Sequence, residues 1–180
     1  MALTARNFND DLTATQAPEI DAAIRLAIKE RYPEVRAIVQ ACPQNDKLGI
    51  DYWLEYQNGT MQTLDAKIRE LDYSKRGDDR IACIELMANT RKQKLGWSID
   101  PSKRTDIVLF YYIETGAAYF YPARELRAAI IASLDLLKRD GKPATQKTES
   151  YGNTYSSESL FVSHAELWRA IYRTCTKQAA

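Results

Sequence analysis

Two aspartates and a lysine flank a predicted hairpin turn, and their types and spacing suit metal-assisted phosphate chemistry. Asp51 precedes the turn, and Asp65 and Lys67 follow it. Carboxylate oxygens bind hard divalent cations such as Mg²⁺ and Mn²⁺, which also bind the phosphate oxygens of a substrate. A neighbouring ammonium group can orient or deprotonate an attacking water, or stabilise charge that develops on phosphate. These three residues are therefore the first candidate site.

The hairpin decides whether the two acids meet. Two runs of alternating apolar and polar residues, near 48–56 and 60–70, flank an Asn-Gly pair that ends at Gly59, which is a strong hairpin signal. A two-residue turn would set Asp51 opposite Ala66, whose side chain belongs to the apolar face, so the two acids would not meet. A three-residue loop at the Asn-Gly pair sets Asp51 across from Asp65 and keeps one face apolar on both strands. Because a buried face specifies register strongly, we predict the three-residue loop.

An aspartate followed across a hairpin by Asp-x-Lys resembles the motif of the PD-(D/E)xK nuclease superfamily, which has the restriction-endonuclease-like fold. The matching residues are Asp51, Asp65 and Lys67. The resemblance implies that the two acids hold Mg²⁺ or Mn²⁺, with the backbone carbonyl of Ala66 as a further ligand. Lys67 would position the water for in-line attack on phosphorus. On this basis we predict a metal-dependent phosphodiesterase, a nuclease that hydrolyses DNA.

Further acids are candidates for the same site. In the superfamily the helix before the hairpin often supplies one, and Glu30 or Glu34 would fill that role here; the alternative is a solvated helix charge. Glu85 interrupts the otherwise apolar run at 80–88. A lone carboxylate in such a strand needs a partner or a function. It is either a third metal ligand or the ion-pair partner of Arg69 or a nearby lysine.

A basic loop at 91–104 carries a tryptophan. Cations bind the phosphate backbone and aromatic rings stack on bases, so this loop suits nucleic-acid contact. The alternative is a solvated loop whose tryptophan packs against the sheet edge. The candidate nucleic-acid contacts are Arg69, Arg91, Lys92, Lys94, Trp97, Lys103 and Arg104.

Composition narrows the class of protein. The chain has 180 residues with 45% hydrophobic and 27% charged residues, which predicts one globular domain, 1–180. A net charge of +1 requires any nucleic-acid surface to be a local patch. No apolar run is long enough to cross a membrane. The three cysteines are far apart and read as reduced thiols of a cytoplasmic protein. A single histidine excludes a His-rich metal site, and the small size fits a homodimer.

The predicted fold is α/β (α+β type), a restriction-endonuclease-like mixed central sheet of five or six strands flanked by helices. Residues 1–15 read as a loose tail, and 33–47 as a second helical piece or a loop. Residues 142–158, rich in Thr, Ser, Gly and Lys, read as an exposed loop. Helices are expected from Pro18 to before Pro33, over 123–140 and after the Ser163 capping box, and strands at 80–88, 105–114, 117–122 and 160–162.

Two other functions use the same residues. The first is a catalytically inactive nucleic-acid- or protein-binding module on the same fold, in which the acids are salt-bridge partners. The second is a small structural protein whose charged face is an interface. Metal binding separates the enzyme from both, because only the enzyme requires the acids to hold an ion.

Overall fold

The computed structural model describes residues 6–7, 17–70, 72, 77, 79, 81–150 and 153–178. They belong to two compact units, where the sequence predicts a single domain. The hairpin unit consists of Thr15–Asp72 and Ser102–Ala123, and the second unit of Met1–Ala14, Tyr73–Pro101 and Arg124–Ala180. The hairpin with its two aspartates lies wholly in the first of these units.

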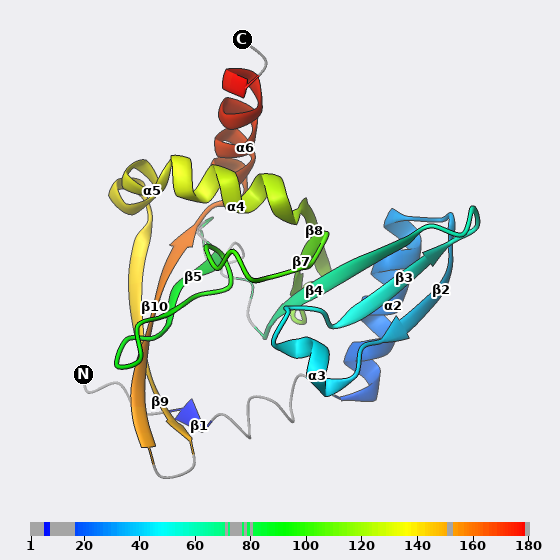
Figure 1. Cartoon of the computed structure of the whole chain (residues 1–180), viewed down its shortest axis with the longest axis horizontal. Coiled ribbons are helices and arrows are strands. Elements are labelled where there is room, and N and C mark those ends of the chain that lie inside the picture. The colour runs from blue at the N-terminus through cyan, green and yellow to red at the C-terminus, as the bar shows by residue number, and fades with distance from the viewer. Residues whose placement is uncertain are drawn as a thin grey trace. The chain divides into compact units, whose positions relative to one another are not determined.

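The hairpin unit is built on a five-stranded sheet with the order β2-β3-β4-β7-β8 (Figure 1). Strands β2, β3 and β4 form an antiparallel meander, β4 pairs in parallel with β7, and β8 is antiparallel to β7. The strands span Val35–Gln40 (β2), Tyr52–Tyr56 (β3), Met61–Arg69 (β4), Ile107–Tyr112 (β7) and Ala117–Pro122 (β8). The predicted α+β class with a mixed sheet is therefore confirmed.

The β3–β4 hairpin has the predicted three-residue loop. Tyr52 pairs with Leu64 in the ladder, and the Tyr56 N–H donates to the Thr60 carbonyl at 2.9 Å. Gly59 has φ +81°, a left-handed conformation that glycine adopts without the steric cost of a side chain. The predicted register is thus confirmed.

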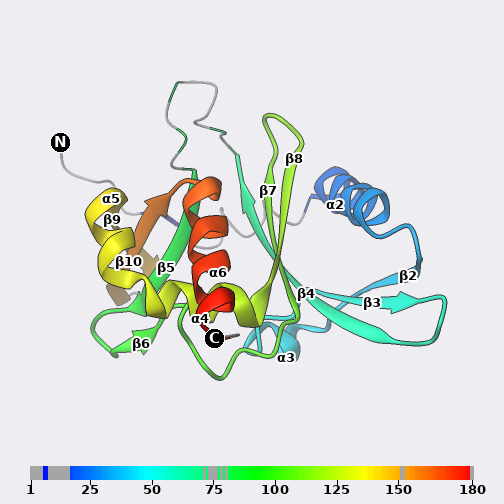
Figure 2. The same ribbon diagram turned by 90° about the horizontal axis from the view of Figure 1, so that it is seen from above.

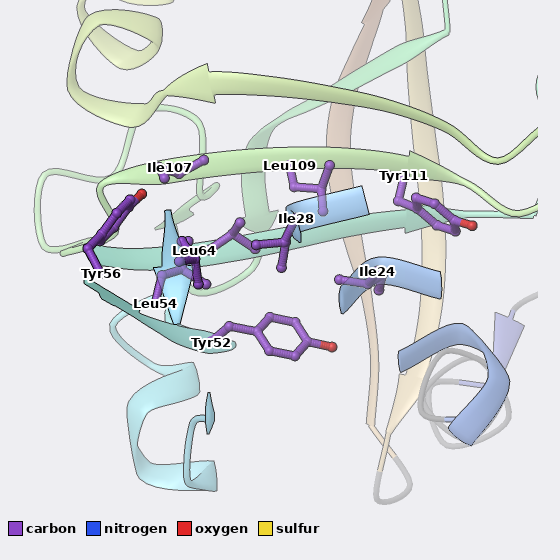
Figure 3. Packing of buried hydrophobic residues seen from close by; sticks show 10 residues of the cluster. Ile24, Ile28, Tyr52, Leu54, Tyr56, Leu64, Ile107, Leu109 and Tyr111 are labelled. Carbon is purple, nitrogen blue, oxygen red and sulfur yellow. The ribbon is translucent and has the colours of Figure 1, made fainter. Parts of the chain in front are cut away.

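Helix α2 (Pro18–Arg31) covers the apolar face of this sheet. Figure 3 shows Ile24 and Ile28 of the helix facing Leu54, Leu64 and Leu109 of three strands. The helix begins at a proline, whose fixed φ suits the first helical turn, and has two acids in that turn. Burial of this core leaves the other face of β4 to its polar residues.

Residues 33–47 are the first correction to the sequence-based prediction. Val35–Gln40 forms strand β2, which was not predicted, and only the short helix α3 (Pro43–Asp46) matches the expected helical piece. In β2, Ile38 pairs with Leu54 and packs against the core of the hairpin unit. The strand is short and partly exposed, and its place beside β3 is a long-range pairing that local periodicity does not reveal.

The second unit has its own sheet, in the order β1-β9-β10-β5-β6 (Figure 2). Its strands are Arg6–Asn7 (β1), Ala82–Asn89 (β5), Lys94–Leu95 (β6), Lys142–Ser150 (β9) and Asn153–Val162 (β10). Its helices are α4 (Ala123–Ala132, whose first residue belongs to the hairpin unit), α5 (Leu134–Asp140) and α6 (His164–Gln178). The predicted capping box of α6 is confirmed, since Ser163 and Glu166 exchange hydrogen bonds. No helix in the described part of the chain is long and apolar enough to cross a membrane.

The exposed loop expected at 142–158 is wrong. Of these, 142–150 and 153–158 belong to β9 and β10, which pair antiparallel from Asn153 with Ser150 to Phe161 with Lys142, and 151–152 lie outside the described residues. Threonine favours strands, and pairing of the two polar segments satisfies their backbones without an apolar face. Of the expected tail at 1–15, Arg6 and Asn7 pair with β9, and the rest lies outside the described residues.

Candidate functional site

The central element of the site is the polar face of β4. Asp65 and Lys67 alternate with core residues of the strand, and the Lys67 Nζ lies 2.7 Å from the Asp65 Oδ1. The Asp65 residue is 3% exposed. A carboxylate this deeply buried is costly unless it is paired, and Lys67 supplies the countercharge. The ion pair thus joins a buried carboxylate to a lysine whose side chain is 24% exposed.

Asp51 joins this pair from the start of β3. Its Oδ2 accepts a hydrogen bond of 2.7 Å from the Ala66 N–H, and its own N–H donates to the Leu64 carbonyl at 2.9 Å. The carboxylate thus lies at the peptide that follows Asp65. In an antiparallel ladder the N–H and C=O of one residue point to the same neighbouring strand. The Ala66 carbonyl therefore faces the Asp51 side as well.

Gly49 and Lys103 close the site next to Asp65, and sequence reasoning missed their role there. A Cβ on Gly49 would lie 3.3 Å from the Asp65 Oδ2 and 3.1 Å from the Lys103 Cδ. Gly49 has φ +72°, which further favours glycine. The aliphatic part of Lys103 thus lies beside the acid pair, by which we mean Asp51 and Asp65. No local signal in the sequence indicates this approach, since Lys103 follows Gly49 by more than fifty positions.

The donor set fits a hard divalent cation only in part. Two carboxylates and a main-chain carbonyl are all oxygen donors, as Mg²⁺ and Mn²⁺ require, and such ions complete their shells with water or phosphate oxygens. Within the described residues, no group of three or more His, Cys, Asp or Glu side chains could hold a metal. Protein ligands beyond the acid pair would therefore come from the backbone.

Glu30 and Glu34 do not join the acid pair. The Gln57 N–H donates to the Glu34 carbonyl at 2.9 Å, so Glu34 lies at the loop end of the hairpin. With a rise of about 3.3 Å per residue, this end is about 20 Å along the strand from Asp51. Glu30 is exposed in the last turn of α2. The helix acid that does reach the hairpin is Asp21.

Asp21 accepts a hydrogen bond of 2.9 Å from the Tyr52 hydroxyl and forms an ion pair of 2.6 Å with Arg25. Burial, followed by this hydrogen bond, raises the pKa of Tyr52 above its ordinary value. Tyr52 belongs to the apolar core face. Asp21 therefore fixes α2 on the sheet, and the i,i+4 spacing of Asp21 and Arg25 was the available signal.

Glu85 belongs to the second unit. It is half-buried in β5, its Oε2 accepts the Trp97 N–H at 3.4 Å, and its carbonyl accepts the Ser98 hydroxyl at 2.6 Å. Gly96 lies against it so closely that a Cβ there would be 2.0 Å from the Glu85 carbonyl oxygen. Glu85 is thus part of a packed turn, and Trp97 is half-buried in that turn.

The predicted basic loop is divided between the two units. Arg91, Lys92 and Lys94 are exposed around β6 in the second unit. Lys103 and Arg104 belong to the hairpin unit, where the Arg104 N–H donates to the Leu48 carbonyl at 2.8 Å. Arg69 is half-buried at the end of β4, in register with Tyr112. Of the predicted nucleic-acid contacts, the structure brings Lys103 to the acid pair.

Comparison with protein-family models, with curated proteins and with solved structures found no match.

Proposed function

We propose that the chain is a metal-dependent phosphodiesterase that hydrolyses DNA, a nuclease of the PD-(D/E)xK type. The observation that carries the proposal is the meeting of Asp51, Asp65 and Lys67 at one stretch of β4. Two acids and an ammonium group at this spacing are the set that metal-assisted hydrolysis of a phosphodiester uses. The parallel pairing of β4 with the buried strand β7 holds this set on a rigid support.

Each residue has a separate role in this proposal. Asp51 and Asp65, with the Ala66 carbonyl, would hold Mg²⁺ or Mn²⁺, which when bound activates a water and neutralises phosphate charge. Lys67 lies against Asp65 and orients the attacking water or stabilises the charge that develops on phosphate. The Ala66 N–H holds the Asp51 carboxylate in place before substrate arrives.

We also propose a cytoplasmic protein that acts alone or as a homodimer. The described cysteines Cys42, Cys83 and Cys175 form no disulfide bond, which is the usual state of cysteines in a reducing compartment. The near-neutral net charge of +1 leaves association of two copies without strong repulsion.

One observation favours a second candidate, a catalytically inactive binding module on the same fold. Lys67 already neutralises Asp65, and the Ala66 N–H already satisfies one Asp51 oxygen. Acids with such partners are stable without an ion. In this reading the ion pair is structural and the hairpin unit binds nucleic acid or protein without cutting it.

The test compares Asp51→Asn with Asp106→Asn. Asp51→Asn keeps an oxygen for the Ala66 N–H but loses its charge, whereas Asp106 is an exposed acid of the same unit that accepts the Thr63 N–H at 2.8 Å. We expect wild type to nick plasmid DNA with Mg²⁺ or Mn²⁺. Asp51→Asn should lower the rate by about 10²-fold or more and weaken Mn²⁺ binding in calorimetry, whereas Asp106→Asn should change neither. A wild type that neither nicks DNA nor binds millimolar Mn²⁺ favours the inactive module.

A further inference from the structure

Two distant segments that carry three basic residues meet beside the acid pair. Lys47 ends the short helix α3, and Lys103 and Arg104 follow the crossover from the second unit. The Lys103 Nζ donates to the Lys47 carbonyl at 3.0 Å, and the Arg104 N–H donates to the Leu48 carbonyl at 2.8 Å. We call Lys47, Lys103 and Arg104 the cationic rim.

The backbone of the rim is held by β4 itself. Asp106, two residues after Arg104, is bound to Thr63: its N–H donates to the Thr63 Oγ1 at 2.9 Å, and its Oδ2 accepts the Thr63 N–H and the Thr63 hydroxyl, each at 2.8 Å. Thr63 is buried and lies two residues before Asp65 on the same face of β4. The rim is therefore fixed relative to the acid pair, and loop motion does not set the distance between them.

The charges of the rim remain available to a ligand. Lys47 and Arg104 are exposed and Lys103 is half-buried. Among the described residues, none of the three forms an ion pair with a carboxylate. By contrast, the Lys67 charge is already used by Asp65. Fixed, unneutralised cations beside an acid pair are complementary to a phosphate backbone that must lie across it.

We propose that the cationic rim binds the phosphodiester backbone of a nucleic acid and positions it at Asp51 and Asp65. This inference rests on the proposed function and assigns binding of the nucleic-acid substrate to the hairpin unit. Lys103 is its central positioning residue, because its stem lies against Gly49 next to the Asp65 Oδ2. The basic turn of the second unit, Arg91, Lys92 and Lys94, has a secondary part in this proposal.

The test compares two triple variants that lose the same charge. The rim variant is Lys47→Gln, Lys103→Gln and Arg104→Gln, and the turn variant is Arg91→Gln, Lys92→Gln and Lys94→Gln. Binding of a fluorescein-labelled DNA duplex is measured by anisotropy in EDTA at several salt concentrations, so that no turnover occurs. We expect the rim variant to bind about 10-fold more weakly or worse, with a salt slope smaller by roughly 2 to 3, since each lost phosphate contact removes about 0.9. The turn variant should lose less than about 3-fold.

The proposal that the rim binds DNA would be overturned if both variants lost the same affinity, or if the rim variant bound DNA as tightly as wild type does. Lys103→Arg keeps the charge and should retain most of the affinity, which separates a charge effect from a packing defect, and thermal melts check the fold of each variant.

The binding role of the rim and the proposed hydrolysis of DNA can be contradicted separately. Rim-dependent binding without cleavage in Mg²⁺ or Mn²⁺ would contradict hydrolysis alone. Cleavage whose KM is unchanged in the rim variant would contradict the rim alone.

Discussion

Asp65 in the hairpin unit and Glu85 in the second unit are both carboxylates on inner strands beside a glycine, but their partners differ. Asp65 is paired with the ammonium group of Lys67 at 2.7 Å. Glu85 accepts the main-chain N–H of Trp97, and its own carbonyl accepts the Ser98 hydroxyl. A carboxylate bound to the main chain of a turn is part of that turn. A carboxylate paired with a flexible ammonium group can exchange that partner for a metal cation, and the released ammonium group can then bind a phosphate.

The glycines beside the two acids make the same contrast. A Cβ on Gly96 would collide with backbone, the Glu85 carbonyl at 2.0 Å, whereas a Cβ on Gly49 would meet two side chains at 3.1 and 3.3 Å. Backbone cannot move aside cheaply, but the ends of side chains can. The turn at Gly96 is therefore rigid packing, and the space at Gly49 belongs to the polar residues of the site.

The largest effect should follow from Lys67→Ala. The Asp65 residue is 3% exposed, and Lys67 supplies the ammonium group that pairs with it. The variant leaves a buried carboxylate without its partner, so we expect a stability loss of about 3–5 kcal/mol in urea unfolding. If the proposed function holds, plasmid cleavage should also fall by about 10²-fold or more.

A double variant separates these two effects. Asp65→Asn combined with Lys67→Met removes both charges and should recover most of the stability without recovering cleavage. Glu85→Gln is the matched control, because the amide oxygen still accepts the Trp97 N–H and both properties should stay near wild type. If Lys67→Ala unfolds at the same urea concentration as wild type, Asp65 does not depend on its ion pair for stability, and the proposed difference between Asp65 and Glu85 is wrong.

Gly96→Ala should have the next largest effect, and on stability alone. The added methyl group would overlap the Glu85 carbonyl, and forced overpacking of this kind costs about 1–3 kcal/mol and occasionally more. Gly59→Ala is the control, since Gly59 has φ +81° but no atom within 4 Å of a Cβ and should lose about 1 kcal/mol. Chemical denaturation of both variants measures the difference, and similar losses would show that crowding at Gly96 is relieved by small shifts.

The smallest effect is a pH dependence of the hairpin unit. Burial raises the pKa of Tyr56 from 10.0 to about 12. Between these values the unfolded chain loses the phenolic proton while the folded protein keeps it, so stability should fall as pH rises from 10 towards 12. Below pH 10 this contribution is fully present. In Tyr56→Phe the decline should be shallower, as measured by urea midpoints at several alkaline pH values; an equal slope would exclude Tyr56 as a source.

Local patterns were sufficient for much of the fold. The alternation on both sides of the Asn-Gly pair predicted the β3–β4 register, because shifting it by one residue would expose the face that Leu54 and Leu64 bury. The capping box at Ser163 and the apolar run at 107–112 were equally local signals. Strand β2 was missed because it pairs with β3 across a longer segment and is partly exposed. Strands β9 and β10 pair with each other as neighbours in the sequence, but they were missed in whole or in part because their residues are largely polar.

By itself, the sequence determined which residues form the candidate site: Asp51, Asp65 and Lys67 are placed by a hairpin whose register depends on neighbours within twenty positions. Only the tertiary structure decided which distant residues accompany them. Lys47 and Lys103 meet at Gly49 because the chain leaves the hairpin unit and returns to form β7 beside β4. Glu85 and the basic turn remained in the other unit. The burial of Asp65 was also visible only in the tertiary structure, because it results from packing of residues that sequence spacing does not describe.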